Sequence, residues 1–115
     1  MKQGEIWLIN LDPTVGAEIK KTRPAIIVND NALGKLPLKI IVPLTDWNER
    51  YSIAPWMVRI VPDSGNKLTK VSAADGFQIR SISEERFIKK IGCVSTGNLD
   101  DIKEALSKVL TIDRS

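Results

Sequence analysis

Residues 4–28 open with Gly4-Glu5-Ile6-Trp7-Leu8-Ile9-Asn10-Leu11, continue through Asp12-Pro13-Thr14-Val15-Gly16, and end with Thr22-Arg23-Pro24-Ala25-Ile26-Ile27-Val28. The first run is rich in residues that favour β-strands, and the second is rich in residues that favour turns. Pro24 disfavours helical backbone at Arg23, and the apolar run after it is typical of a buried strand. The stretch therefore predicts two strands joined by a polar loop, with Arg23 where the second strand begins.

Two roles fit Arg23 at this position. Its guanidinium stays charged and presents a planar set of donors that matches a phosphate group. An ordinary surface arginine at a strand end fits the same pattern. Residues 4–28 alone leave both interpretations open.

The composition excludes several classes of protein and of catalytic site. The chain has 115 residues, 43% of them hydrophobic and 27% charged, which predicts one globular domain over residues 1–115. It has no histidine and one cysteine, Cys93, so His/Cys metal clusters, Ser–His and Cys–His pairs and an internal disulfide are excluded. The single cysteine fits a reducing cytosol, so we expect a cytoplasmic protein. We expect no membrane contact, because no apolar run approaches the length of a bilayer span. The net charge of +3 favours polyanionic partners only weakly.

Further strands are predicted along the rest of the chain, at residues 38–44, 56–61, 74–82 and 87–94, with polar turns at 62–65 and 83–85. In the strand at 74–82, we expect Phe77 and Ile79 on one face and Gln78 and Arg80 on the other. Trp7 and Trp56 fall in strand patterns that favour the core.

The C-terminal residues predict a helix, because Leu99, Ile102, Leu106 and Val109 form one apolar stripe for packing against the sheet or a second subunit. Thr96 or Asn98 is expected to cap its start, with Asp100 and Asp101 in the first turn. Several short strands followed by one helix predict a mainly β (α+β) chain, with a small, strongly bent sheet or open barrel.

Polar side chains lie where three predicted strands meet solvent. If 25–28 and 38–44 pair as antiparallel neighbours, Arg23 and Thr45 arrive at the same end of the sheet, where sites are often built. Taken alone, Thr45 also fits a turn former, and Gln78 and Arg80 fit a solvated strand face. Trp47, in the loop after Thr45, is the tryptophan placed best to contact a ligand.

These motifs resemble the MazF/PemK family of toxin endoribonucleases. The resemblance rests on Gly4 to Leu8, Leu11 to Glu18, Thr22 to Val28, Val42-Pro43-Leu44-Thr45, Phe77 to Ile82 and the tail from Ile102 to Ile112. It runs along nearly the whole chain in the right order, and the opening segment is its most specific part.

The resemblance implies an SH3-like open β-barrel of the CcdB/PemK type that acts as a homodimer. Such toxins cut single-stranded RNA, chiefly mRNA, at short sequences without a metal or cofactor, and an antitoxin neutralises them. The family's catalytic arginine and threonine fall on Arg23 and Thr45. Its RNA contacts fall on Glu18, Gln78 and Arg80.

The residues agree with this chemistry on physical grounds. RNA carries its own nucleophile, the 2′-hydroxyl, so a protein without histidine can cleave it by positioning that group and stabilising the charge that develops on the phosphate. Arg23 suits the charge, and Thr45 can hydrogen-bond a phosphate oxygen or relay a proton. We therefore expect a 2′,3′-cyclic phosphate, a 5′-hydroxyl and resistance of DNA.

The chain also departs from the family pattern. Phe77 stands where some members have an acid, and Ile19 and Lys21 replace the Gln and Gly often found in the loop. Lys20 and Lys21 are expected either to strengthen contact with phosphates or to change the base preference. Glu18 and Asp75 are candidates for the general base, and neither is assigned.

Two other functions compete with RNA cleavage. One is a gyrase-poisoning toxin on the same scaffold, which acts through its helix end, often with a terminal aromatic residue. The end Thr111-Ile112-Asp113-Arg114-Ser115 argues against it. The other is a barrel that binds RNA or protein without catalysis.

Overall fold

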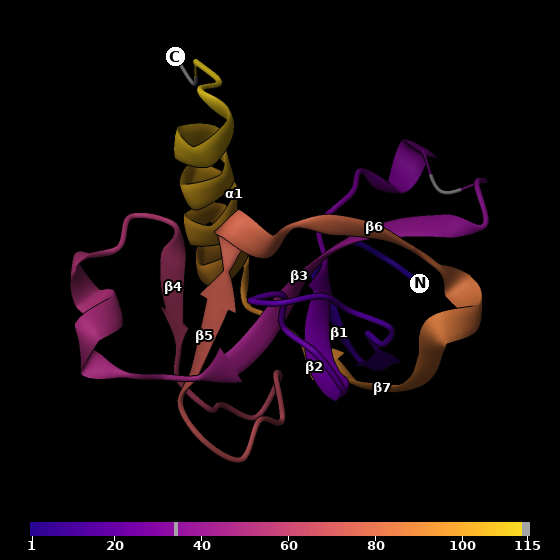
Figure 1. Cartoon of the computed structure of the whole chain (residues 1–115), viewed down its shortest axis with the longest axis horizontal. Helices are drawn as coiled ribbons and strands as arrows, with labels where there is room; N and C mark the ends of the chain where they lie inside the picture. The colour runs from indigo at the N-terminus through magenta and orange to yellow at the C-terminus, as the bar shows by residue number, and fades with distance from the viewer. Residues whose placement is uncertain (34, 114–115) are drawn as a thin grey trace.

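The computed structural model describes residues 1–33 and 35–113. Part of the C-terminal sequence that argues against gyrase poisoning, Arg114 and Ser115, lies outside these residues. Figure 1 shows an antiparallel sheet that curls around the molecule, with a helix standing beside β4 and β5. The strands are β1 Glu5–Asn10, β2 Thr22–Ile27, β3 Leu38–Asp46, β4 Met57–Ile60, β5 Ser72–Asp75, β6 Arg80–Ser83 and β7 Phe87–Cys93, and the helix is α1 Thr96–Leu110. Single 3₁₀ turns are η1 Asn31–Leu33, η2 Glu49–Ile53, η3 Gly76–Gln78 and η4 Glu84–Arg86.

The strand order is β4-β5-β3-β2-β1-β7, and β6 also pairs with β3. The long strand β3 therefore organises the sheet. Its middle pairs with β2 in the register Ala25↔Pro43, while β6 pairs with its first half and β5 with its last residues. In the described part of the chain no pairing joins β4 to β7, so the barrel is open.

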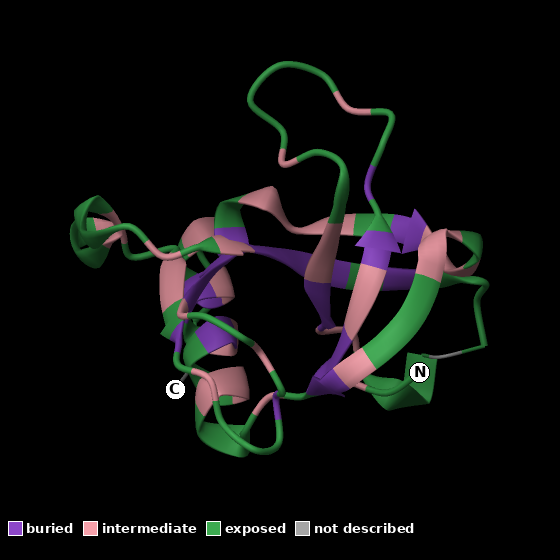
Figure 2. Ribbon diagram, turned by 90° about the horizontal axis from the view of Figure 1, so that it is seen from below, coloured by how far each residue is buried: buried purple, intermediate pink, exposed green. Residues whose placement is uncertain are grey.

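The sheet is buried on both faces around β2 and β3. Ile26 and Val42 pair and belong to one apolar cluster, whereas Ile27 and Ile41 pair and belong to a second one. Successive strand residues point to opposite faces, so burial on both faces explains the unbroken apolar runs in these two strands. Figure 2 shows these buried segments running through the middle of the molecule, with exposed residues in the connecting loops.

The predicted strand at 74–82 is wrong as one element, because η3 divides it into β5 and β6. β3 pairs with Ala74 at Leu44 and with Arg80 at Ile41. These two positions are three residues apart on β3 but six residues apart on the partner segment. The three extra residues form η3, which the Asp75 carboxylate caps by accepting from the backbone nitrogen of Phe77 at 3.0 Å. Phe77 and Ile79 therefore do not share the face of one strand, and Phe77 is 66% exposed.

The C-terminal helix is confirmed, with a different start. Ser95 is its N-cap, accepting from the backbone nitrogen of Asn98, so Thr96 and Asn98 are not the cap. Because the helix begins at Thr96, Asp100 and Asp101 lie beyond its first turn, so their predicted position in that turn is wrong. It packs against β4 and η3 and buries Ile102 in the first apolar cluster.

The expected fold class, a mainly antiparallel β structure with a C-terminal helix, is confirmed. The core placement of Trp56 is wrong, because the residue is 37% exposed and its ring packs edge-on against exposed Phe77. Trp7 packs against the second cluster and Phe87, as its strand pattern predicted. Within the described residues, none of the helices is both long and apolar enough to cross a bilayer.

Candidate active site

Arg23 and Thr45 line the same small cavity, of about 100 Å³. The pairing of β2 with β3 ends at Ala25↔Pro43, and Arg23 and Thr45 each lie two residues beyond this pair. The other lining residues are Pro24, Leu44, Asp46, Leu68, Thr69, Lys70 and Ser72. The two side chains thus lie at one end of the sheet, as the antiparallel pairing predicted, and their catalytic roles stay predictions.

The Arg23 guanidinium is held from one side. Its Nε donates to the carbonyl of Lys20 at 3.0 Å, and the side chain is half-buried. Because this bond uses one of five N–H donors, the terminal nitrogens keep donors for a ligand. Pro24 restricts the backbone directly after Arg23.

Lys70 also lines this cavity, and the sequence did not point to it. Its Nζ lies 3.1 Å from the Asp46 carboxylate, in an ion pair at the cavity. Lys70 lies 25 residues beyond Thr45 in a loop without a recognisable motif. The pairing of β5 with the end of β3 is the signal that could have found it, because Asp46↔Ser72 brings the two loops together.

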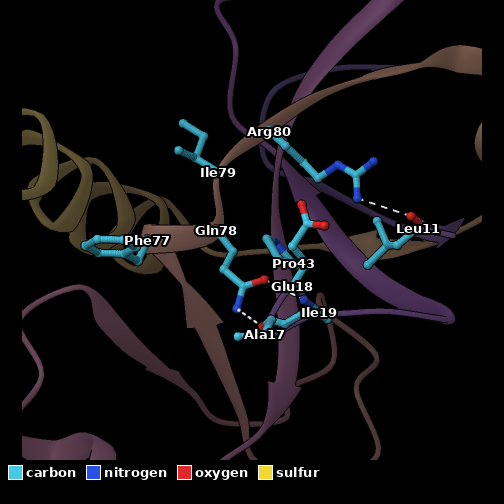
Figure 3. A pocket seen from close by; sticks show the side chains of 9 residues that line it. All are labelled: Leu11, Ala17, Glu18, Ile19, Pro43, Phe77, Gln78, Ile79 and Arg80. Carbon is cyan, nitrogen blue, oxygen red and sulfur yellow. Dashed lines mark hydrogen bonds between the residues drawn. The ribbon is translucent and has the colours of Figure 1, made fainter. Parts of the chain in front are cut away.

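A second and larger cavity, of about 430 Å³, contains three predicted RNA-binding residues, Glu18, Gln78 and Arg80. It lies between the β1–β2 loop and the segment η3–β6, as Figure 3 shows. Its remaining lining residues are Leu11, Ala17, Ile19, Pro43, Phe77 and Ile79. Pro43 lines this cavity and Thr45 lines the smaller one, and the two residues are about 7 Å apart along β3.

Hydrogen bonds hold the polar side chains of this larger cavity. The Gln78 amide oxygen accepts from the backbone nitrogen of Ile19 at 2.5 Å, and its Nε2 lies 3.3 Å from the carbonyl of Ala17. Arg80 donates from Nη1 to the carbonyl of Leu11 at 3.1 Å. Glu18 accepts from the backbone nitrogen of Val15 at 2.6 Å. The β1–β2 loop therefore rests on η3 and β6 through side chains.

Asp75 lies behind Gln78 and is 6% exposed. Burial raises the pKa of its carboxyl, against the lowering effect of hydrogen bonds from the backbone of Phe77 and from Gln78. One carboxylate oxygen accepts from Gln78 Nε2 at 3.3 Å. Asp75 lines neither cavity, so it meets Gln78 and not the pair Arg23 and Thr45.

The remaining predicted RNA-binding residues lie outside both cavities. Lys20 and Lys21 are exposed at the end of the β1–β2 loop, and Lys21 has a positive φ of 71°. Trp47 follows Asp46 directly, but its ring packs edge-on against Tyr51 and its Nε1 donates to Glu49. Among the described residues, no three His, Cys, Asp or Glu side chains gather into a group that could hold a metal ion.

Several solved structures share this fold. MazF from Deinococcus radiodurans aligns with a TM-score of 0.79 at 20% identity, over 97% of each chain. A mycobacterial endoribonuclease in complex with its cognate antitoxin aligns with a TM-score of 0.78 at 19% identity, over 100% of this chain and 99% of that one.

Similarity in amino-acid sequence identifies the family as well as the fold. The chain is 32% identical to "Endoribonuclease MazF9" of Mycobacterium tuberculosis over 112 residues, 92% of each chain. It is 34% identical to "Endoribonuclease PemK" of Escherichia coli over 113 residues, 96% of this chain and 83% of the relative. The family model "PemK-like, MazF-like toxin of type II toxin-antitoxin system" matches residues 2–110. The chain therefore belongs to the PemK-like, MazF-like toxins of type II toxin–antitoxin systems.

Proposed function

We propose that this protein is a sequence-specific endoribonuclease that cleaves single-stranded RNA, chiefly mRNA, and arrests growth by inhibiting translation. The observation that carries the proposal is the shared cavity of Arg23 and Thr45. The relatives named endoribonucleases support the same activity. In this proposal residues 1–115 act as one domain in the cytoplasm, where mRNA is found.

The proposed reaction is an internal transfer of the phosphate. The 2′-hydroxyl of the RNA releases its proton as its oxygen bonds to the adjacent phosphorus. The bond from phosphorus to the 5′-oxygen breaks and that oxygen takes up a proton, so the products are a 2′,3′-cyclic phosphate and a 5′-hydroxyl. Arg23 binds the non-bridging oxygens as negative charge grows on them, which is the largest contribution expected from a site of this kind. Thr45 donates a hydrogen bond to the same phosphate or relays a proton.

The donor set of the cavity supports a reaction without metal. It holds a guanidinium, an ammonium, three hydroxyls and the single carboxylate of Asp46. Positive and neutral donors of this kind stabilise a phosphate directly, whereas Mg²⁺ prefers several oxygen ligands such as carboxylates.

The larger cavity is the proposed binding site for the nucleotides beside the cut. Glu18, Gln78 and Arg80 offer a carboxylate, an amide and a guanidinium that can read base edges. Lys20 and Lys21 lie at the loop end, where exposed ammonium groups attract the phosphate backbone. Trp47 adjoins the other cavity through Asp46 and offers an indole on which a base can stack.

The proposed protein partners are a second copy of this chain and a cognate antitoxin. The solved mycobacterial relative described as bound to its cognate antitoxin supports an antitoxin here as well. A positively charged toxin favours an acidic, disordered segment as the part that binds.

The experiment that tests the function uses the purified protein, a mixed-sequence single-stranded RNA pool and excess EDTA. We expect cuts at a short recurring sequence, with cyclic phosphate and 5′-hydroxyl ends, and no cutting of the 2′-deoxy pool. An intact RNA pool would remove the endoribonuclease function, and a gyrase supercoiling assay would then test the competing toxin activity. Products with 5′-phosphate ends would contradict the proposed reaction.

A further inference from the structure

Lys70 places a second cation in the cavity of Arg23 and Thr45. In the described structure its ammonium pairs with Asp46, whose carboxylate belongs to the residue directly after Thr45. We infer that Lys70 is a phosphate-binding residue of this cavity, and that an RNA phosphate replaces Asp46 as the partner of its ammonium. The inference rests on the proposed function and adds a specific contact to it.

The ion pair between Lys70 and Asp46 is suited to exchange. The two side chains are 67% and 66% exposed, so water screens their attraction and the pair contributes little to stability. An RNA phosphate brings one full negative charge to the ammonium, as the Asp46 carboxylate does, so the exchange leaves Lys70 paired with an anion. Lys70 can therefore change partners at small cost.

The backbone of Lys70 is held in place even though its side chain is exposed. Fully buried Asn66 accepts from the backbone nitrogens of Asp63 and Leu68, and donates to the carbonyl of Val61 at 2.9 Å. Closer to the site, Ser72 Oγ donates to the carbonyl of Lys70 at 3.1 Å. The 61–71 loop thus presents Lys70 to the cavity from a fixed position.

This loop is also held against β7. The backbone nitrogen of Cys93 donates to the carbonyl of Gly65 at 3.0 Å. A Cβ on Gly92 would lie 2.5 Å from that carbonyl oxygen, so the strand and the loop approach more closely than any other residue at Gly92 would allow. The placement of Lys70 therefore comes from the fold and not from its contact with Asp46.

The negative charge of Asp46 is the reason that its carboxylate has to leave Lys70 when RNA binds. A phosphate that approaches Arg23 and Thr45 also meets the Asp46 carboxylate, which repels it. When the phosphate pairs with Lys70, Asp46 loses its partner and can turn toward water, because it ends a strand at the surface. Removing the Asp46 charge should therefore strengthen RNA binding, although it removes an ion pair from the free protein.

The test measures binding of a single-stranded 2′-O-methyl RNA pool, which has no free 2′-hydroxyl and is not cut, by fluorescence anisotropy over a series of salt concentrations. Each phosphate contact on a single strand contributes about 0.7 to the slope of log affinity against log salt. We expect Lys70→Gln to weaken binding several-fold and to reduce the slope by about 0.7. Lys70→Arg should keep the slope, and Asp46→Asn should tighten binding.

The matched control is Lys67→Gln, in the same loop. Lys67 is exposed, carries the same charge and lies outside the cavity, so the change alters net charge equally and should leave the slope near that of the wild type. Equal slopes for Lys70→Gln and Lys67→Gln would overturn the inference. Weaker binding by Asp46→Asn would overturn the exchange of partners.

Parallel cleavage assays separate this inference from the proposed function. If the wild type cuts RNA and Lys70→Gln matches Lys67→Gln in both rate and slope, the inference fails and the function stands. If the wild type cuts no RNA, the function fails, and the slopes still decide whether Lys70 contacts phosphate. A wild type that does not bind the 2′-O-methyl pool at all would also overturn the inference.

Discussion

The amide oxygen of Gln78 accepts a hydrogen bond from the backbone nitrogen of Ile19 at 2.5 Å, across 59 residues of sequence. The same side chain donates from Nε2 toward the carbonyl of Ala17 and the carboxylate of Asp75. One glutamine therefore joins the β1–β2 loop to a buried acid at the end of β5. This contact closes one side of the larger cavity.

Replacing Gln78 should loosen the loop. In Gln78→Ala the Ile19 amide loses its acceptor, so we expect its hydrogen exchange to rise about tenfold and the free energy of unfolding to fall by about 1 kcal/mol. Hydrogen exchange followed by NMR measures the first quantity, and urea unfolding measures the second. Gln3→Ala is the control, because Gln3 is the chain's other glutamine and its amide donates to the carbonyl of Val28 instead. An unchanged exchange rate for Ile19 in Gln78→Ala would show that the loop is held by other contacts.

Asp75 should give the stability a distinct pH dependence. Burial raises the pKa of its carboxyl above the ordinary value of 3.8, so the native state keeps a proton that the unfolded chain has released. The stabilisation from this group is therefore complete below pH 3.8 and is lost as the pH rises through the raised pKa. Urea unfolding at a series of pH values should show the wild type losing stability relative to Asp75→Asn across this window. Parallel curves for the two proteins would contradict a raised pKa.

Gly92 should not tolerate a side chain. Its added Cβ would meet backbone atoms of Gly65 and Asn66 at 2.5 to 2.8 Å, and backbone cannot move aside as a flexible side chain can. We expect Gly92→Ala to lower the free energy of unfolding by about 3 kcal/mol, at the upper end of typical overpacking costs. Thermal and urea unfolding measure this loss. Gly16→Ala is a useful comparison, because Gly16 has open space around its Cβ position and its cost would come from its positive φ of 60° alone.

The hydroxyl of Thr45 should matter more than its methyl group. Thr45→Ala removes the hydrogen bond proposed to reach the phosphate, and we expect its single-turnover cleavage rate to fall about 100-fold or more. Thr45→Ser keeps the hydroxyl and should stay within about tenfold of the wild type. Equal rates for Thr45→Ala and Thr45→Ser would show that the hydroxyl takes no part in the reaction.

The sequence was most informative where local pattern and tertiary structure agree. The runs around Ile26 and Val42 predicted two buried strands. These strands pair in the structure, and Arg23 and Thr45 line one cavity, as expected if the two strands were neighbours. The prediction of one strand at 74–82 was wrong because apolar and polar residues alternate over 77–80, a pattern that is typical of a strand. Only the pairing of β5 and β6 with different parts of β3 shows that three residues must leave the sheet.

The parts of the site that the sequence missed depend on long-range packing. Nothing near Lys70 in the sequence indicates that its loop is held by Asn66 and by the absence of a side chain at Gly92. The sequence does not single out Ser95 as the helix cap, because Thr96 and Asn98 close to it are equally good capping residues by type. For Lys70, residue type was compatible with several structures, and contacts of its loop with other segments selected one.

The measurement that tests the central claim most directly compares single-turnover RNA cleavage by the wild type, Arg23→Ala and Arg50→Ala. Arg50 is exposed in η2 and lines neither cavity, so its removal controls for the loss of one positive charge. The account predicts a loss of about 1000-fold in Arg23→Ala, with affinity for RNA reduced far less and with Arg50→Ala close to the wild type. Cleavage by folded Arg23→Ala at the wild-type rate would contradict it.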